Sequence, residues 1–243
     1  MKVKIVAWSI SIIILMIFTS VLLDNKKMKE DIVKLRQQIK ELEIDSTSLS
    51  YYFIKADEAY KNDDWNSVTT NAFAYEDKAV RINEPVNPVI YLYSSYAYYK
   101  LYKAKLDNNT NTLADLNLLD SGLIAIEKYL SKIQDKPMPY FIKGLLLLDY
   151  ENRDEQYVKK MDQAFISFEK SKKFTNDVKQ LSNTIYHMGF ALYKKGLYYK
   201  GIQEYGLAIK SFKEADKLLN NSSHENAKVL IKGITILIKQ CEN

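Results

Sequence analysis

The chain has 243 residues, of which 7 are glycine, 4 are proline and one is cysteine. So few helix breakers favour long helices over a many-turned β-sandwich or barrel, and the scarcity of glycine argues against a glycine-rich nucleotide loop. The single Cys241 excludes an intramolecular disulfide framework and a cysteine-based metal cluster. The net charge of +5 comes from interspersed basic and acidic residues. Nucleic-acid binders gather their basic residues on one face, so we expect no nucleic-acid binding.

Residues 1–24 are predicted to form an N-terminal transmembrane signal anchor. The segment from Ile5 to Leu23 contains 19 residues without a charge, preceded by Lys2 and Lys4. A helix rises about 1.5 Å per residue, so this segment spans a hydrocarbon core of about 30 Å. A cleaved signal peptide is the alternative. Its apolar region is shorter and ends at a small-x-small cleavage site, whereas this segment ends in large residues.

The orientation of the anchor depends on two opposing observations. Basic residues are more numerous after the apolar segment than before it, which alone places the large domain in the cytoplasm. An N-terminal apolar segment preceded by lysines, however, commonly exports the domain that it precedes. We predict a single-pass protein of a bacterial inner membrane with its large domain extracytoplasmic, the bacterial origin being indicated by the Lys- and Asn-rich, Pro-poor composition.

Residues 25–46 are predicted to form a short coiled-coil stalk. Met28, Ile32, Leu35, Ile39 and Leu42 recur at alternating spacings of four and three residues. This is an a/d seam with Ile at a and Leu at d, which favours two parallel strands and hence a homodimer. The seam covers little more than two heptads, and a single amphipathic helix that continues the membrane helix is the alternative.

Residues 47–243 are predicted to be all-α, with about nine helices. Apolar residues recur three and four apart, and no alternating β-type run of useful length occurs. Ser222 and Glu225 have the spacing of a capping box, which predicts a last helix from Ser223 to Gln240. The expected breaks between helices are Asn62–Asp64, Asn83–Pro88, Asp107–Asn111, Gln134–Pro139, Glu151–Asp154, Thr175–Asp177, Lys195–Gly196 and Asn220–Ser223.

The segment from Ile185 to Ala208 resembles the tetratricopeptide repeat, a pair of antiparallel helices. Ile185, Met188, Gly189 and Leu192 match its first helix, Gly196 and Tyr198 its turn, and Gly201, Tyr205 and Ala208 its second helix. Three looser units extend the resemblance over residues 50–216: Ala59-Tyr60 with Trp65, a unit with Ser95 in place of glycine, and Gly144 with Ala164, Phe168 and Ser171. The resemblance implies an α-solenoid of helical hairpins, in which each hairpin buries its face against the next.

The resemblance also implies a concave groove lined by the first helix of each hairpin. Rigid aromatic side chains and lysines on such a wall suit an extended peptide. The alternative is that these residues belong to the core. The candidate groove residues are Leu92, Tyr96, Tyr99, Lys100, Phe141, Leu145, Leu148, Tyr186, Phe190, Tyr193 and Lys194.

No residue pattern indicates catalysis, so we expect neither an enzyme nor a cofactor. His187 and His224 lack the spacing of metal ligands, and we interpret them as surface or capping residues, with His187 at a solvent-facing position. Cys241 has no histidine partner nearby in the sequence. The expected function is a membrane-anchored scaffold that binds a protein or peptide. The alternative is a structural, homo-oligomeric helical spacer without a peptide groove.

Overall fold

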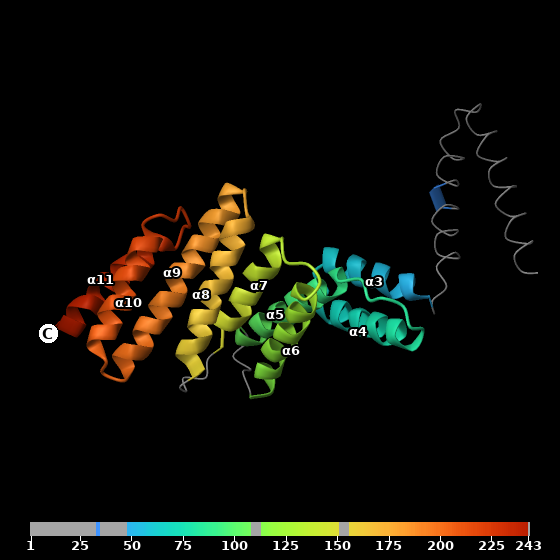
Figure 1. Cartoon of the computed structure of the whole chain (residues 1–243), viewed down its shortest axis with the longest axis horizontal. Helices are drawn as coiled ribbons and strands as arrows, with labels where there is room; N and C mark the ends of the chain where they lie inside the picture. Colours follow the sequence, from blue (N-terminus) through green and yellow to red (C-terminus); the bar gives the residue numbers. More distant parts are fainter. Residues whose placement is uncertain (1–32, 35–47, 108–112, 151–155, 243) are drawn as a thin grey trace, which may run out of the picture. The chain divides into compact units, whose positions relative to one another are not determined.

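The computed structural model describes residues 33–34, 48–107, 113–150 and 156–242 (Figure 1). Their regular structure is entirely helical and contains no strand, so the all-α prediction is confirmed for this part of the chain. By its internal contacts the chain divides into two units, residues 1–51 and 52–243. The helices are α3 (Leu49–Lys61), α4 (Trp65–Arg81), α5 (Val89–Asp107), α6 (Leu113–Leu130), α7 (Pro137–Leu148), α8 (Gln156–Phe174), α9 (Val178–Gly201), α10 (Tyr205–Leu219) and α11 (Ala227–Glu242).

The predicted anchor and nearly all of the predicted stalk lie outside the described residues. Val33 and Lys34, the two residues of this region that the structure describes, are helical and exposed. Within the described ranges no helix combines the length and the apolar character needed to cross a membrane. The anchor at residues 5–23 therefore stays a prediction.

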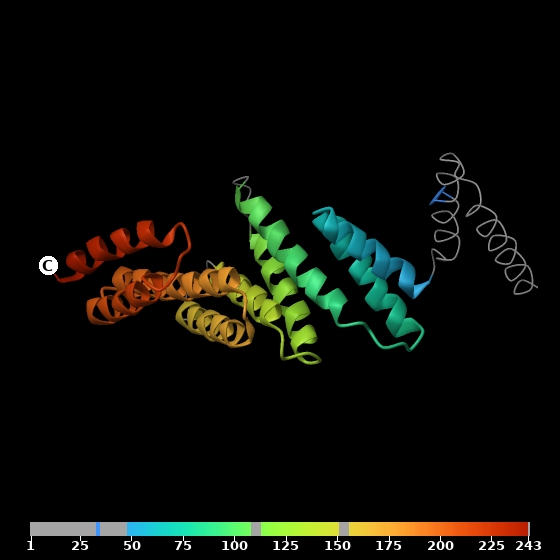
Figure 2. The ribbon, with the colours of Figure 1, turned by 90° about the horizontal axis from the view of Figure 1, so that it is seen from above.

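Helices α4 to α11 pack mainly against their neighbours in sequence. Helices α5 and α6, α7 and α8, and α9 and α10 form closely packed pairs, and α4, α6, α8 and α10 each also pack on the next helix of the chain (Figure 2). Helix α5 also contacts α7, α7 contacts α9, and α9 contacts α11. Within the described part, the backbones of α4, α6, α8 and α10 do not pack on one another, although the side chains of Glu76 on α4 and Lys128 on α6 form an ion pair. We call α3, α5, α7 and α9 the first helices and α4, α6, α8 and α10 the second helices.

Local side-chain chemistry sets several of the helix boundaries. Asp64 and Asp177 accept hydrogen bonds from the backbone N–H groups of Ser67 and Gln180, at 3.1 and 2.6 Å, and so cap α4 and α9. Pro137 begins α7, where its missing N–H costs nothing. The predicted breaks at residues 62–64, 83–88, 134–139, 175–177 and 220–223 are therefore confirmed, although α7 begins at Pro137, inside the break predicted at 134–139. The break at 151–154, and most of that at 107–111, lies outside the described residues.

The predicted break at Lys195-Gly196 is wrong, because α9 continues through it to Gly201. The missing side chain of Gly196 serves helix packing and not a turn, since a Cβ there would lie 2.6 Å from the ring of Phe212 on α10. The turn falls at residues 202–204, where Gln203 adopts the left-handed conformation with φ of 64°. Gly201, which was matched to the second helix of the repeat, is the last residue of α9, and a Cβ added there would meet no atom within 4 Å.

The hairpins share one packing pattern. On α9 the glycine that fits this pattern is Gly196, seven residues after Gly189, which the resemblance had placed there. Each first helix buries a small residue where it packs on its second helix: Ala56, Ser95, Gly144 and Gly196. On α9 the expected Gly189 is buried as well, and a Cβ there would lie 2.7 Å from Leu219 of α10. Each second helix buries three residues spaced four and then three apart: Val68, Ala72 and Tyr75; Gly122, Ile126 and Tyr129; Ala164, Phe168 and Ser171; and Ala208, Phe212 and Ala215. The small residues let the two helices approach closely, while the bulky residues fill the space beside the contact.

The contact between α7 and α8 leaves no room for a side chain at Gly144. A Cβ at Gly144 would lie 2.5 Å from the ring of Phe168, which is completely buried. We expect Gly144→Ala to lower the free energy of unfolding by about 1–3 kcal/mol, because the ring has no space into which to move. Chemical denaturation followed by circular dichroism measures this loss.

Gly206→Ala is the matched control. Gly206 lies near the start of α10, where a Cβ meets nothing within 4 Å. The control is expected to leave stability unchanged or to raise it by up to about 1 kcal/mol, through the better helix propensity of alanine. Equal effects of the two substitutions would contradict the packing account.

Candidate partner-binding face

The candidate groove residues all lie on α5, α7 and α9, but they are not equally accessible. Leu145 and Leu148 are buried, at 7% and 2% exposure, inside the cluster between α7, α8 and α9, so their assignment to a groove is wrong. Their helix is apolar on several sides, and these two residues lie on a side that packs into the core. The others are half-buried: Leu92, Tyr96, Tyr99, Lys100, Phe141, Tyr186, Phe190, Tyr193 and Lys194. We call these nine residues the first-helix face.

An aromatic cluster forms the part of the face on α5. Tyr96 contacts the indole of Trp65 edge-on, with ring centroids 5.5 Å apart, and Tyr60 stacks on Tyr93 at 4.4 Å. The ammonium group of Lys100 lies 5.8 Å from the Trp65 ring and 5.5 Å from the Tyr96 ring, within cation–π range. Half-exposed rings beside a lysine provide contact area for a partner at a low cost in side-chain entropy.

Other tyrosines of α5 serve the packing of the hairpins. The hydroxyl of Tyr93 donates to the carboxylate of Asp57 on α3, at 2.8 Å. Burial, together with this hydrogen bond, raises the pKa of Tyr93 to about 12. Tyr102 is almost fully buried, and its hydroxyl donates to the backbone carbonyl of Asp149 at the end of α7, at 3.1 Å. The tyrosine-rich helix therefore contributes to both the core and the face.

Asp149 joins the three first helices α5, α7 and α9. It is the C-cap residue of α7, and its side chain is only 16% exposed. Its carboxylate lies 3.3 Å from the ammonium of Lys103 on α5 and 3.9 Å from that of Lys194 on α9. Lys194 also donates to the backbone carbonyl of Leu148, at 2.8 Å. Cations at the C-terminus of a helix are favoured by its dipole, so both lysines stabilise the end of α7.

Tyr99 belongs to this polar junction and not to an open wall. Burial, with a contribution from its hydrogen bond to Asp149, raises the pKa of Tyr99 above its usual range. Asp149 and Lys103 were not predicted as site residues. The one signal in the sequence was that Asp149 is the first polar residue after the apolar run from Gly144 to Leu148.

The part of the face on α9 continues as a second aromatic cluster. Phe190 stacks between Tyr186 and Tyr193, with ring centroids 6.1 and 5.8 Å away. The ammonium of Lys194 lies 5.6 Å from the Phe190 ring. Phe141 on α7 contacts the ring of His187, which places the α7 and α9 parts of the face beside each other. The predicted residues are thus brought together in two aromatic clusters with the Asp149 junction between them.

His187 is packed among rings, so its predicted solvent-facing position is wrong. It stacks on the buried Phe168, with centroids 5.5 Å apart, and its Nδ1 is buried without a hydrogen-bond partner among the described residues. His187 lies on the side of α9 that packs on α8, where Phe168 is buried. Burial lowers the pKa of His187 to about 4, with smaller contributions from His224 and Lys103.

His224 lies half-buried in the turn that precedes α11, and its side chain binds the backbone of a residue before the helix. Its Nδ1 accepts the backbone N–H of Asn226 at 3.2 Å, and its ring stacks on Tyr186 with centroids 3.9 Å apart. The predicted capping box at Ser222 and Glu225 is wrong, because the Ser222 hydroxyl accepts the N–H of His224, two residues away, at 3.1 Å. Helix α11 accordingly begins at Ala227 and not at Ser223.

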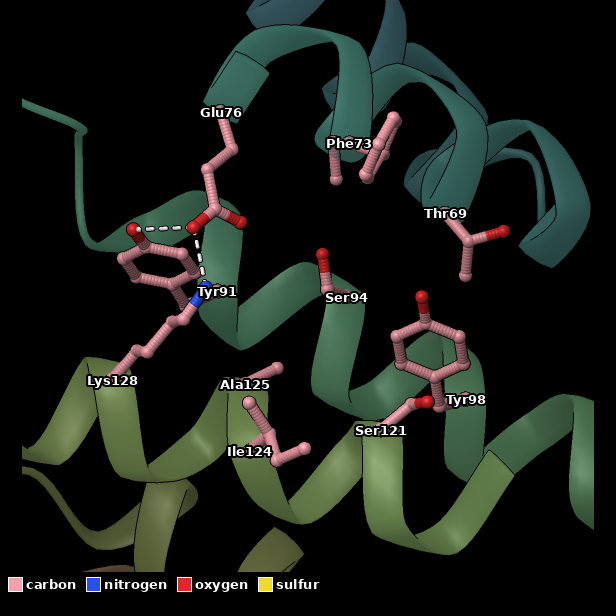
Figure 3. Close-up of a pocket in the computed structure, with 11 residues that line it drawn as sticks. Thr69, Phe73, Glu76, Tyr91, Ser94, Tyr98, Ser121, Ile124, Ala125 and Lys128 are labelled. Carbon is pink, nitrogen blue, oxygen red and sulfur yellow. Dashed lines mark hydrogen bonds and ion pairs between the residues drawn. The ribbon is translucent and has the colours of Figure 1, made fainter. Parts of the chain in front are cut away.

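A separate pocket of about 170 Å³ opens between α4, α5 and α6 (Figure 3). Its floor and walls include Ala72, Ser94 and Ala125, and Phe73 and Ile124 flank it, although they are 72% and 61% exposed. At one end Glu76 accepts a hydrogen bond from Tyr91 and pairs with Lys128 of α6 (Figure 3). This pocket is not lined by any residue of the first-helix face.

Comparison with known proteins identifies no relative of this chain. No protein-family pattern, no curated protein and no solved structure matches it. Within the described ranges, no three histidine, cysteine or acidic side chains are grouped so that they could hold a metal ion.

The buried His187 makes the stability of the fold depend on pH. Because its folded pKa of about 4 lies below the ordinary value of 6.5, the unfolded chain binds the proton more readily. The contribution of the neutral His187 to the free energy of unfolding is therefore complete above pH 6.5 and is lost as the pH falls towards 4. We expect the wild-type protein to lose up to about 3 kcal/mol relative to His187→Phe between pH 7 and pH 4.

Urea titrations of both proteins at half-unit pH intervals measure this difference. Phenylalanine keeps the ring contacts but does not titrate. The effects of all other titrating groups on the free energy of unfolding are the same in the two proteins, so they cancel in the difference. A constant difference in unfolding free energy across the range would show that His187 is not the group responsible.

Proposed function

We propose that this chain is a membrane-anchored scaffold that binds a protein or peptide through the first-helix face. The observation that carries the proposal is the arrangement of half-exposed aromatic rings and lysines on α5 and α9, on either side of the Asp149 junction. Tyr96 with Lys100 and Phe190 with Lys194 repeat the same pairing of a ring and a cation. Aromatic and cationic side chains are the groups that most often dominate the energy of protein interfaces.

The hairpin architecture supports the same proposal. The repeated small residue on each first helix, and the three buried residues on each second helix, are consistent with a tetratricopeptide-like α-solenoid. When Gly196 is taken as the small residue of the first helix, the resemblance is carried by the segment from Gly196 to Ala215, which contains Tyr205, Ala208 and Phe212. Solenoids of this kind place successive first helices side by side, which suits an extended ligand.

The ligand best matched to this face is a peptide with apolar or aromatic side chains and at least one carboxylate. Lys100 and Lys194 supply positive charge at the two aromatic clusters. The negative charge of Asp149 is already paired with Lys103 and Lys194. The proposed anchor at residues 5–23 would hold the scaffold at an inner membrane, with the helical hairpins extracytoplasmic. No enzymatic step or cofactor is part of the proposal.

The test requires variants that change the face and still fold. Tyr193 also packs on the buried ring of Phe212, with ring centroids 6.1 Å apart, so the melting temperature of each variant is measured beside its binding. Tyr99 is unsuitable, because its removal would also break the Asp149 junction. We expect Lys100→Glu combined with Tyr193→Ala to reduce the yield of partner cross-linked to the face in living cells at least tenfold. A photoreactive residue at position 92 reports the yield, and mass spectrometry identifies the cross-linked segment.

Lys170→Glu is the matched control. Lys170 lies on the second helix α8, with its ammonium 5.4 Å from the Tyr140 ring, much as Lys100 lies 5.5 Å from Tyr96. The control should leave cross-linking and the melting temperature unchanged. An equal partner yield from wild type and the double variant, both folded, would reject the face as the binding site.

A further inference from the structure

We infer that α11 binds an amphipathic, acidic helix of a partner protein, which packs on it in the way that a second helix packs on a first helix. The binding surface consists of Val229, Gly233 and Ile236, and we call these three residues the α11 face. They are spaced four and three residues apart, so they lie on one side of the helix. The α11 face is distinct from the first-helix face, so this inference does not depend on the proposed function.

The sequence of α11 repeats a pattern of the first helices α7 and α9. In each of these three helices, a segment of eight residues begins and ends with an apolar residue and has lysine and glycine at its fourth and fifth positions. The segments are residues 140–147, 192–199 and 229–236. Helix α11 therefore has the sequence of a first helix.

On α7 the second helix α8 covers this pattern. Tyr140 stacks on Phe174 of α8, with ring centroids 5.8 Å apart, and Leu147 is buried in the cluster that contains Phe168 of α8. A Cβ at Gly144 would lie 2.5 Å from the Phe168 ring. The two apolar residues and the glycine thus form the contact between the helices of this hairpin.

On α9 the second helix α10 covers the same three positions. Leu192 and Tyr199 pack against the cluster that contains Phe212 of α10. A Cβ at Gly196 would lie 2.6 Å from the Phe212 ring. The pattern therefore has the same structural use in two hairpins.

On α11 these positions are uncovered. Val229 and Ile236 are 72% and 58% exposed, and a Cβ added at Gly233 would meet no atom within 4 Å. Helix α11 packs on α9 and α10, and no other described helix packs on it (Figure 1). A helix at the end of such a stack normally has a polar outer side, whereas the α11 face is apolar. The face is thus suited to a helix supplied by a partner.

The two covered hairpins define the shape of that partner helix. Each second helix places a phenylalanine ring against the glycine, with a small residue four positions before it and another three positions after it. These buried triplets are Ala164, Phe168 and Ser171 on α8, and Ala208, Phe212 and Ala215 on α10. A partner helix with this spacing would bury its ring in the space left by Gly233.

The lysine of the pattern indicates the charge of the partner. Lys143 on α7 and Lys195 on α9 pair with Glu127 and Asp162, which lie on the second helices α6 and α8. Lys232, at the same position of α11, forms no ion pair within the described ranges. Helix α11 carries three lysines, and its one acid is its last residue. The partner helix is therefore expected to supply carboxylates beside its apolar side.

Binding of a designed peptide to the full-length chain in detergent tests the inference. The peptide has the sequence of residues 205–219 with Lys210, Lys213 and Lys217 replaced by glutamate, so that it keeps the α10 triplet and becomes acidic. It is acetylated, amidated and labelled with a fluorophore. Fluorescence anisotropy should show saturable binding. The same peptide with Phe212→Asp should bind at least tenfold more weakly.

Variants of the full-length chain locate the peptide. Gly233→Leu should weaken binding at least tenfold without lowering the melting temperature, because the new side chain has space in the free protein and occupies the place of the docked ring. Gly206→Leu is the matched control, since a Cβ there also meets no atom within 4 Å, and it should bind like the wild type. Lys232→Glu should weaken binding at least threefold.

The double variant Lys100→Glu, Tyr193→Ala should bind this peptide like the wild type, which separates the α11 face from the first-helix face. Several results would overturn the inference: no saturable binding of the acidic peptide, equal binding of the two peptides, or an affinity that neither Gly233→Leu nor Lys232→Glu changes. A wild-type dimer that Gly233→Leu dissociates would assign the α11 face to a second copy of this chain instead.

Discussion

The carboxylate of Asp149 is the interaction on which the arrangement of the first helices depends. Its side chain lies at the end of α7, where the unpaired carbonyls of the last turn also need partners. Lys103 reaches it from α5 and Lys194 from α9, and Tyr102 donates to its backbone carbonyl. A partly buried carboxylate is stabilised only when such partners surround it, so helices of three successive hairpins meet at one residue.

The close approach of paired helices provides the frame for this junction. Gly144 and Gly196 each lie against a phenylalanine ring of the second helix, at separations that leave no room for a Cβ. This packing fixes the spacing between first and second helices, and thereby places Tyr96 and Lys100 on α5, and Phe190 on α9, on either side of Asp149. Some of the aromatic contacts join neighbouring first helices: Tyr60 of α3 stacks on Tyr93 of α5, and Phe141 of α7 contacts His187 of α9.

The sequence predicts helix boundaries well where a residue's own chemistry decides them. Asp64 and Asp177 cap helices through their side chains, and Pro137 begins one. Gly196 was misassigned to a turn because glycine also serves close helix packing, and the sequence does not distinguish the two uses. Seven residues are nearly two helical turns, so Gly189 and Gly196 lie on the same side of α9 and satisfy the same pattern.

The site was harder to predict than the fold, since it depends on which residues of distant segments meet. Tyr96, Lys100 and Phe190 lie on the predicted face, whereas Leu145 and Leu148 are core. The polar junction was missed because Lys103, Asp149 and Lys194 are far apart in sequence.

The most direct test of this account is amide hydrogen exchange of Asp149→Asn compared with Asp135→Asn. Asp135 is 74% exposed in its side chain and pairs loosely with Lys136, at 4.0 Å. If Asp149 holds the first helices together, its substitution should increase exchange in α5 near Lys103, at the end of α7 and in α9 near Lys194, while the control changes nothing there. An increase confined to the last turn of α7 would contradict the account.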